Sequence, residues 1–188
     1  MKKEVRSMNF AILQLLVKEK IYAWLKKDNM EVKLERYRKQ GAKIGGGVRA
    51  FSPISSAEPY LISIGNNTTI STNVKFITHD NAAIKIFDIG TDLVGGINIG
   101  NNCFIGANSI LLPGVNIGNN VIVGAGSCVT KSFENEGVII AGNPAKIIGT
   151  VEKYHEKYKN NVFDFSGENR KYKKQMIQEN PEKLINKH

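Results

Sequence analysis

The chain has 188 residues, of which 41% are hydrophobic and 23% are charged, a composition that suits one globular domain with terminal extensions. Its formal net charge of +9 comes from the two ends: residues 1–43 contain 12 basic and 5 acidic side chains, and residues 151–188 contain 9 and 6. Residues 44–150 contain 5 and 6 and are close to neutral. Basic flanks around a neutral centre lack the concentrated basic stripe of a nucleic-acid-binding protein, so we expect no nucleic-acid partner.

The N-terminal segment, residues 1–43, is predicted to be helical. Apolar residues recur on one side over 8–27, and a second, more polar helix is predicted over 31–40. The apolar run 9–17 is too short to span a bilayer. It either packs against the rest of the protein or a partner subunit, or lies on a membrane surface, so membrane contact is at most peripheral.

No secretory signal is evident in the sequence. Within the repeat described next, Cys103 occupies an inward position and Cys128 an outward one, so the two thiols are not expected to form a disulfide. Both observations favour a reducing, cytoplasmic location.

A six-residue repeat dominates residues 44–150. Each unit opens on an aliphatic residue and has Asn or Gly three positions later. These two residue types tolerate positive φ best, so every unit predicts a short strand followed by a tight turn. The openers are Ile64, Ile70, Ile99, Ile105, Leu111, Ile117 and Val123, and the turn residues are Asn67, Asn73, Asn102, Asn108, Gly114, Asn120 and Gly126.

Three units per coil would place each residue over the one eighteen positions later, at the strand spacing of about 4.8 Å. Ile99 then stacks on Ile117, and Leu111 stacks on Val129. Residues 44–150 are therefore predicted to be a mainly β, triangular solenoid with flat faces and an apolar interior.

The repeat breaks at one place. The unit that opens at Phe76 has His79 where Asn or Gly is expected, and residues 82–98 follow no hexad. A long loop inserted at one corner of a regular solenoid is more often functional than accidental. The only histidine of the repeat region therefore marks the candidate site.

Beyond the repeat, residues 151–188 are predicted to form a C-terminal tail with two helical segments. Within the repeat, several outward positions are apolar, which indicates a surface covered by a partner. The simplest partner is a second copy of the chain, in a three-fold homo-oligomer; a covering helix is the alternative. These outward residues are Phe104, Ile110, Leu112 and Ile122.

The same residues carry a resemblance to a known family, the hexapeptide-repeat acetyltransferases. Within it, the chain is most similar to the galactoside and maltose branch and to its capsule and lipopolysaccharide O-acetyltransferase relatives. The resemblance implies a left-handed parallel β-helix, a homotrimer, and acetyl-coenzyme A bound between adjacent subunits without a metal ion. It is carried by Phe76–Asp80, Ile99–Asn108, Leu112–Gly114, Gly124–Ser127 and Ala141–Lys146.

The resemblance also implies roles for single residues. His79 matches the catalytic general base, a role that suits imidazole because its pKa lies near working pH. The positions that match the cofactor site are Phe104, Ala107, Ala125, Thr130, Lys131 and Lys146. The candidate acceptor-binding residues are Arg49, Glu58, Tyr60 and Asp80, of which Asp80 is also a candidate to orient the His79 ring. Gly149 stands where relatives often carry a second basic residue.

The sequence therefore predicts an acetyl-CoA-dependent O-acetyltransferase that acts on a sugar hydroxyl in surface polysaccharide synthesis. N-acetylation of an amino sugar is the main alternative, and a non-catalytic trimeric scaffold is a more remote one. The same fold also serves γ-type carbonic anhydrases, whose zinc needs three histidines. Here His155 and His188 lie outside the repeat and cannot join His79.

Overall fold

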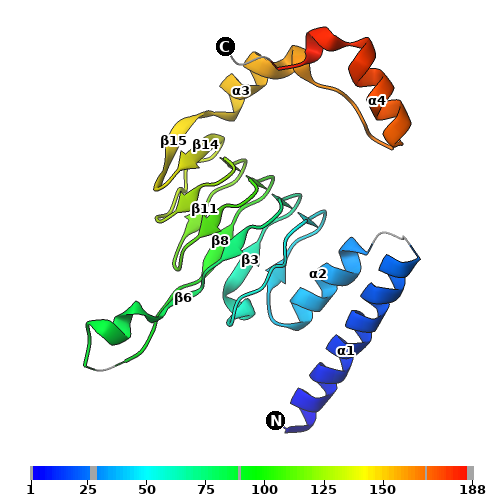
Figure 1. Ribbon diagram of the computed structural model, residues 1–188. Coiled ribbons are helices and arrows are strands. Elements are labelled where there is room, and N and C mark those ends of the chain that lie inside the picture. Colours follow the sequence, from blue (N-terminus) through cyan, green and yellow to red (C-terminus); the bar gives the residue numbers. More distant parts are fainter. Residues whose placement is uncertain (1, 26–28, 89, 168, 186–188) are drawn as a thin grey trace. The chain divides into compact units, whose positions relative to one another are not determined.

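The computed structural model describes residues 2–25, 29–88, 90–167 and 169–185 (Figure 1). The chain divides into two compact units, Met1–Gly149 and Thr150–His188. The first unit begins with helices α1 (Lys2–Trp24) and α2 (Met30–Lys39), followed by the strands. The second unit contains α3 (Val151–Tyr158), η3 (Lys159–Asn161), α4 (Arg170–Glu179) and η4 (Pro181–Lys183).

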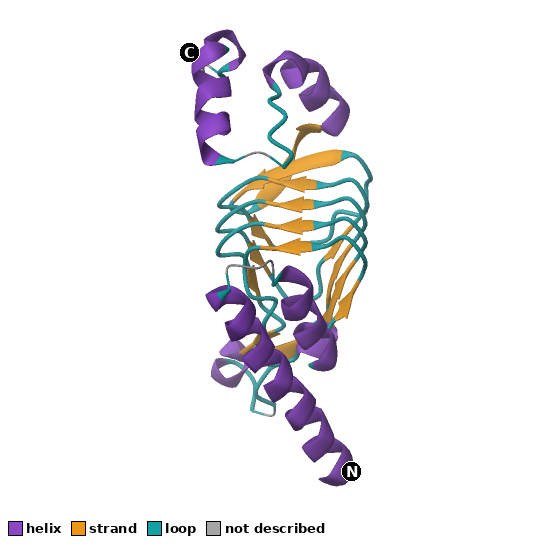
Figure 2. Ribbon diagram, turned by 90° about the vertical axis from the view of Figure 1, so that its right-hand side faces the viewer, coloured by secondary structure: helices purple, strands orange, loops and turns teal. Residues whose placement is uncertain are grey.

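The short strands of the coils form three sheets, and successive coils pair in parallel (Figure 2). The first sheet contains β1 (Lys43–Ile44), β3 (Ile62–Ile64), β8 (Ile97–Ile99) and β11 (Asn116–Ile117). The second sheet contains β2 (Arg49–Ala50), β4 (Thr69–Ile70), β9 (Phe104–Ile105), β12 (Ile122–Val123), β14 (Val138–Gly142) and β15 (Ala145–Thr150). The third sheet contains β5 (Lys75–Phe76), β10 (Ile110–Leu111) and β13 (Cys128–Val129). The chain therefore visits three faces in turn, as the repeat predicts.

The predicted register is confirmed. Ile99 pairs with Ile117, and Leu111 pairs with Val129, each eighteen residues on. The opening aliphatic residues point inward and are almost fully buried, so they fill the interior and hold the sheets together. A shift of one residue would turn this whole set outward, which is why the apolar pattern specifies the register.

The turns between the sheets also follow the prediction. Five asparagines adopt positive φ, namely Asn67, Asn73, Asn102, Asn108 and Asn120, and Gly47, Gly114 and Gly126 do the same. We call the turns between the second and third sheets (residues 71–74, 106–109 and 124–127) the Ala107 corner. The turns that follow the third sheet (residues 77–79, 112–115 and 130–132) are the His79 corner.

Helix α2 packs against the first coil of the solenoid. Its Leu34 and Tyr37 are buried in the same core as the strand residues. On the same helix, the Arg38 guanidinium donates hydrogen bonds to the carbonyl oxygens of Ile44 and Gly45, over 2.9 and 3.1 Å. Because these carbonyls lie at the end of β1, the edge strand of the first sheet, the helix covers the end of the solenoid that would otherwise be an open sheet edge.

In the second unit, α3 and α4 are the two helical segments expected beyond the repeat. The Thr150 hydroxyl accepts a hydrogen bond from the Lys153 amide and caps α3, and the Asn169 side chain caps α4 in the same way. Across the described ranges of both units, no helix has the length and apolar character needed to cross a membrane.

Candidate active site

A two-stranded ribbon leaves the coils at His79. Its strands, β6 (His79–Asp80) and β7 (Leu93–Val94), pair antiparallel, and η2 (Asn81–Lys85) follows β6 (Figure 1). At the base of the ribbon, the Gly95 amide donates to the Thr78 carbonyl over 2.9 Å, and coil pairing resumes at Ile97. Strand pairing therefore holds His79 extended, and it does not adopt the positive φ of the Asn and Gly turn residues.

The His79 ring faces a carboxylate from a distant part of the sequence. Its Nδ1 lies 2.9 Å from Oε2 of Glu58, the residue before η1 (Pro59–Leu61). Because an ionised carboxylate only accepts hydrogen bonds, Nδ1 is the donor, and in the neutral ring this leaves a lone pair on Nε2. Nε2 has no hydrogen-bond partner among the residues that the structure describes, and the side chain is 40% exposed. This nitrogen can therefore accept a proton from a bound molecule.

Glu58 is itself held by two hydroxyl groups. Thr78 Oγ1 donates to the same oxygen, Oε2, over 2.6 Å. Because the hydroxyl hydrogen of Thr78 is used in that bond, the hydrogen bond between Ser56 and Thr78 must have Ser56 as donor. Ser56 Oγ also accepts from the Glu58 amide over 3.1 Å. One continuous chain of hydrogen bonds thus runs from Ser56 through Thr78 to Glu58 and fixes the oxygen that His79 binds.

These contacts change the proton affinities of both partners. Hydrogen bonds from Thr78 and His79 hold the pKa of Glu58 below its usual range. The hydrogen bond to Glu58 and its negative charge raise the pKa of His79, with smaller contributions from Asp92 and Asp80. A raised pKa makes His79 a stronger base, and the ring is neutral, and so able to act as a base, above that pKa.

Asp80, the sequence candidate for orienting the ring, makes a different contact. Its Oδ1 accepts from the Ala82 amide over 2.8 Å and caps η2. Glu58 therefore holds the His79 ring in place of Asp80, which acts on the ring only through its charge.

A shallow hollow of about 280 Å³ lies at the base of the ribbon, in the first unit. Asp80 contributes to it from β6, and Thr130 contributes from the turn two coil layers away. The full lining is Asp80, Leu93, Val94, Gly95, Leu112, Pro113, Gly114 and Thr130. The structure therefore brings one predicted acceptor residue and one predicted cofactor residue to the same depression.

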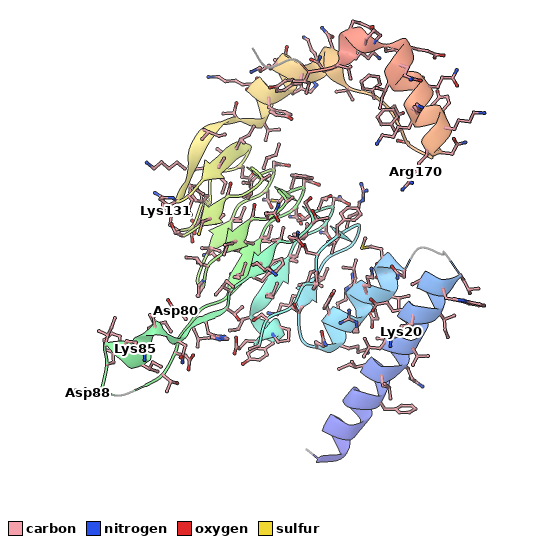
Figure 3. The ribbon with its side chains drawn as sticks, in the orientation of Figure 1. Lys20, Asp80, Lys85, Asp88, Lys131 and Arg170 are labelled. Carbon is pink, nitrogen blue, oxygen red and sulfur yellow. The ribbon has the colours of Figure 1, made fainter. Side chains whose placement is uncertain are left out.

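The other predicted cofactor residues are divided between two places. Lys131 lies with Thr130 at the His79 corner, on the same edge of the coils as Asp80 (Figure 3). Ala107 and Ala125 lie at the Ala107 corner, one coil apart. The third sheet lies between these two corners, so the two sets do not meet at one corner of the chain.

Three further candidates lie on the second sheet, and the fourth, Tyr60, comes just before strand β3 of the first sheet. Arg49 pairs with Thr69, which pairs with Phe104, so the first and last of these are two strands apart. Lys146 is an exposed residue of the edge strand β15. Tyr60 is exposed in η1, close to Glu58 in sequence. None of these four side chains contacts His79 through a hydrogen bond or ion pair in the part of the chain that the structure describes.

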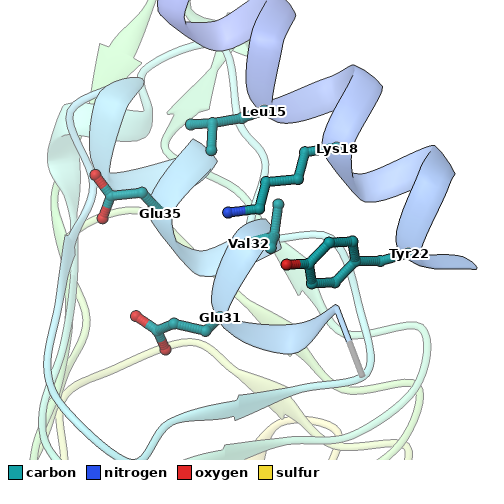
Figure 4. Close-up of a pocket in the computed structure, with 6 residues that line it drawn as sticks. All are labelled: Leu15, Lys18, Tyr22, Glu31, Val32 and Glu35. Carbon is teal, nitrogen blue, oxygen red and sulfur yellow. The ribbon is translucent and has the colours of Figure 1, made fainter. Parts of the chain in front are cut away.

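A larger hollow, of about 420 Å³, lies between α1 and α2 (Figure 4). It is lined by Leu15, Lys18, Tyr22, Glu31, Val32 and Glu35. Two of its acidic groups are already engaged, since Glu31 pairs with Arg38 over 2.6 Å and Glu35 pairs with the same guanidinium over 3.6 Å. Without a histidine or a thiol in its lining, this hollow offers less acid–base chemistry than the His79 corner. In the described ranges, no three His, Cys, Asp or Glu side chains converge as metal ligands.

Sequence reasoning missed Ser56 and Thr78. Both are common residue types in turns, and Thr78 is 1% exposed, so nothing in the sequence separates it from the other small buried residues of the repeat. Glu58 was found, but as a candidate acceptor residue. One signal in the sequence relates Glu58 to His79: both residues lie where the hexad pattern is interrupted.

Comparison with known proteins places the chain in a family. Residues 96–131 match the family described as the hexapeptide repeat of succinyl-transferase. Protein CapG of Staphylococcus aureus is 47% identical over 150 residues, which cover 77% of this chain and 85% of CapG. The chain belongs to the hexapeptide-repeat acetyltransferases. It is therefore an acyltransferase, as the sequence predicts.

Solved structures agree with this fold. A hexapeptide-repeat containing acetyltransferase from Vibrio cholerae has a TM-score of 0.53 and 18% identity, and the match covers 79% of this chain and 93% of the Vibrio chain. A maltose O-acetyltransferase from Clostridium difficile has a TM-score of 0.50 and 24% identity, with 74% and 87% covered. Because these sequence identities are below 25%, the two comparisons show a common architecture alone.

Proposed function

We propose that this acyltransferase moves an acetyl group from acetyl-coenzyme A to a sugar hydroxyl, with Nε2 of His79 as the general base. The observation that supports this most is the pair formed by His79 and Glu58 at the corner where the repeat breaks. The carboxylate fixes the tautomer and the orientation of the ring, and it stabilises the positive charge that the ring gains when it takes a proton.

During the reaction, His79 takes one proton from the acceptor and later gives one proton to the leaving group. A sugar hydroxyl is a weak nucleophile, and its oxygen attacks the thioester carbonyl carbon as its proton passes to Nε2 of His79. The carbon–sulfur bond then breaks. The acyl group stays on the sugar oxygen, and coenzyme A leaves as a thiolate. The protonated His79 returns its proton to that sulfur, so the enzyme ends in its starting state.

The proposed acyl donor, acetyl-coenzyme A, fits the Ala107 corner. The amide N–H groups of Ala107 and Ala125 have no partner among the described residues, and the Ala107 carbonyl accepts from Gly126 over 2.8 Å. Two free donors one coil apart suit the amide carbonyls of an extended pantetheine arm. The exposed Lys131 and Lys146 are candidates for its phosphates, and Phe104 and Thr130 for neighbouring contacts.

Because the two corners are separated within one chain, we propose that a homotrimer builds the complete site from the His79 corner of one subunit and the Ala107 corner of the next. Partly exposed apolar residues on the second and third sheets, such as Phe104 and Ile110, support a covered interface. We further propose that residues 44–150 are the catalytic domain and wind left-handed, as in the family.

The inter-subunit site can be tested by complementation. His79→Ala and Ala125→Trp each disable a different corner, so each variant alone should be inactive. If sites form between neighbours, coexpression restores roughly a quarter of wild-type activity, because one in four random neighbouring pairs carries both intact corners. If each site lies within one chain, every site keeps one defect and the mixture stays inactive.

The acceptor is proposed to be a sugar of a surface polysaccharide or its precursor, bound near Asp80, Tyr60 and Arg49. The deciding assay measures thiol release from acetyl-CoA against a panel of sugars and nucleotide sugars. An amino sugar as the preferred acceptor would instead support N-acetylation, with activity that falls more steeply at low pH because the amine must also lose a proton.

A matched control is available within the chain. His155 also lies beside a carboxylate, with Nδ1 at 3.2 Å from Glu156, but it lies on α3 outside the repeat. His79→Ala should lower kcat/KM by about 10²–10⁴-fold, whereas His155→Ala should leave it unchanged. Full turnover in the His79 variant would refute the assigned base, and absence of both turnover and coenzyme A binding in the wild type would favour a scaffold.

A further inference from the structure

Helix α1 has an apolar face that nothing in the described chain covers. Its other side packs on α2 (Figure 1). There Glu19 of α1 forms an ion pair with Arg36 of α2 over 3.0 Å. On the open side, large apolar residues recur at intervals of three and four, the spacing of one helix face. These residues are Phe10, Leu13, Val17, Ile21 and Trp24, and we call them the open stripe.

The open stripe is strongly exposed for such residues. Trp24 is 82% exposed and Phe10 is 61% exposed. Leaving five large apolar side chains in water on one face is unfavourable, and contiguous patches of this kind mark binding surfaces. The packing of α1 on α2 does not depend on them, because they lie on the opposite side of the helix.

The stretch of sequence that contains the open stripe is basic. Residues 1–27 contain seven Lys or Arg and two Asp or Glu, a net charge of +5. Of the two acidic residues, Glu19 is held by Arg36 on the side that faces α2. Lys20, labelled in Figure 3, comes three residues after Val17 and four before Trp24, so it borders the stripe.

We propose that the open stripe docks on the surface of an anionic lipid bilayer. An apolar face in a basic segment, with Lys20 at its border, is the pattern of helices that lie in the interface, with side chains buried about 5–10 Å below the headgroups. No helix in the described ranges can cross a membrane, so the contact is peripheral. A second copy of α1 fits less well, because pairing two segments that each carry a net charge of +5 brings like charges together. The proposal does not rest on the acetyl transfer.

The chain supplies its own reporter, because Trp24 is its single tryptophan. The full-length protein is mixed with vesicles of phosphatidylcholine alone or with about a third phosphatidylglycerol. With the anionic vesicles, the protein should sediment, Trp24 emission should move to shorter wavelength, and brominated lipid should quench it. Neutral vesicles should bind far less, and salt should weaken the binding to the anionic ones.

Substitutions separate the two contributions. Val17→Glu and Ile21→Glu should each weaken binding at least about tenfold, and Lys20→Gln should weaken it about fivefold by removing one charge from the surface. Val162→Glu, at an exposed apolar residue of the second unit, should bind as the wild type does. His79→Ala should also bind normally, which keeps this result separate from the proposed catalysis. Circular dichroism checks that each variant is folded.

Three outcomes would overturn the proposal. The first is equal binding to neutral and anionic vesicles, or none to either. The second is a Trp24 emission already shifted in vesicle-free buffer, which would mean that another part of the protein covers the stripe. The third is an emission shift that depends on protein concentration without lipid, with a larger assembly that Val17→Glu dissolves, which would identify a second copy as the partner.

Discussion

Replacing Glu58 with Gln removes the negative charge beside His79 while keeping the size of the side chain and its ability to accept a hydrogen bond. In the native protein, one carboxylate oxygen accepts from His79 Nδ1 over 2.9 Å and from Thr78 Oγ1 over 2.6 Å. The charge stabilises the protonated ring, which forms only as the acceptor loses its proton. Because the two side chains are 40% and 22% exposed, solvent screens part of this interaction. We therefore expect kcat/KM at its pH plateau to fall about tenfold, less than for removal of the base itself.

The pH dependence gives a sharper test. Glu58 raises the pKa of His79, so the Gln variant should have a lower pKa at this ring. The neutral, active form of the ring then persists to lower pH, and the acid limb of the kcat/KM profile moves to lower pH. The deficit of the variant should therefore be largest on the plateau and should shrink as the pH falls.

The measurement is thiol release from acetyl-CoA across a pH series at subsaturating acceptor. Glu156→Gln is the matched control, because that carboxylate pairs with His155 in the same way but lies on α3. It should change neither the plateau nor the acid limb. An acid limb that does not move in Glu58→Gln would refute the assignment of that limb to His79, and an unchanged plateau would refute the role of the carboxylate in positioning the base.

Three further substitutions test the framework around the site. Thr78→Val keeps the buried shape but removes the donor to Glu58, and urea unfolding should show a loss of about 1–3 kcal/mol. Gly95→Ala would place a Cβ 2.4 Å from a backbone nitrogen of the next coil, so the Tm should fall by at least about 4 °C, whereas Gly149→Ala, which meets open space, should leave it unchanged. Leu111→Ala empties a fully buried position between paired strands and should cost about 2–5 kcal/mol in a denaturant titration.

The coils could be predicted from the sequence because their signal repeats. Each aliphatic opener and each Asn or Gly turn residue gives the same information again, and a wrong register would expose every opener at once. The pairings of Ile99 with Ile117 and of Leu111 with Val129 follow directly from that repetition. The open stripe of α1 was harder to predict from the sequence. This helix is apolar on both sides, and the sequence does not tell which side meets α2.

The candidate site was only partly predictable, for a related reason. His79 stands out because it interrupts the repeat, but its partner lies in residues 50–61, which have no periodicity. The separation of Glu58 from His79 is 21 residues, which is not a whole coil, so stacking arguments cannot pair them. Only the folded path of the irregular segment brings Ser56 and Glu58 beside the base of the ribbon.

The two interruptions of the repeat meet in space, and this explains why the chemistry sits there. A regular coil uses most of its turn amides to bond a neighbouring coil and its inward side chains to fill the interior, which leaves few side chains free to react. The irregular segment supplies Ser56 and Glu58, the ribbon supplies His79, and Thr78 joins them from the last buried position before the ribbon departs. Because regular coils continue beyond this point, the reactive nitrogen is anchored to a rigid frame while its open side faces solvent. A solenoid that lacked either interruption would lack the paired base.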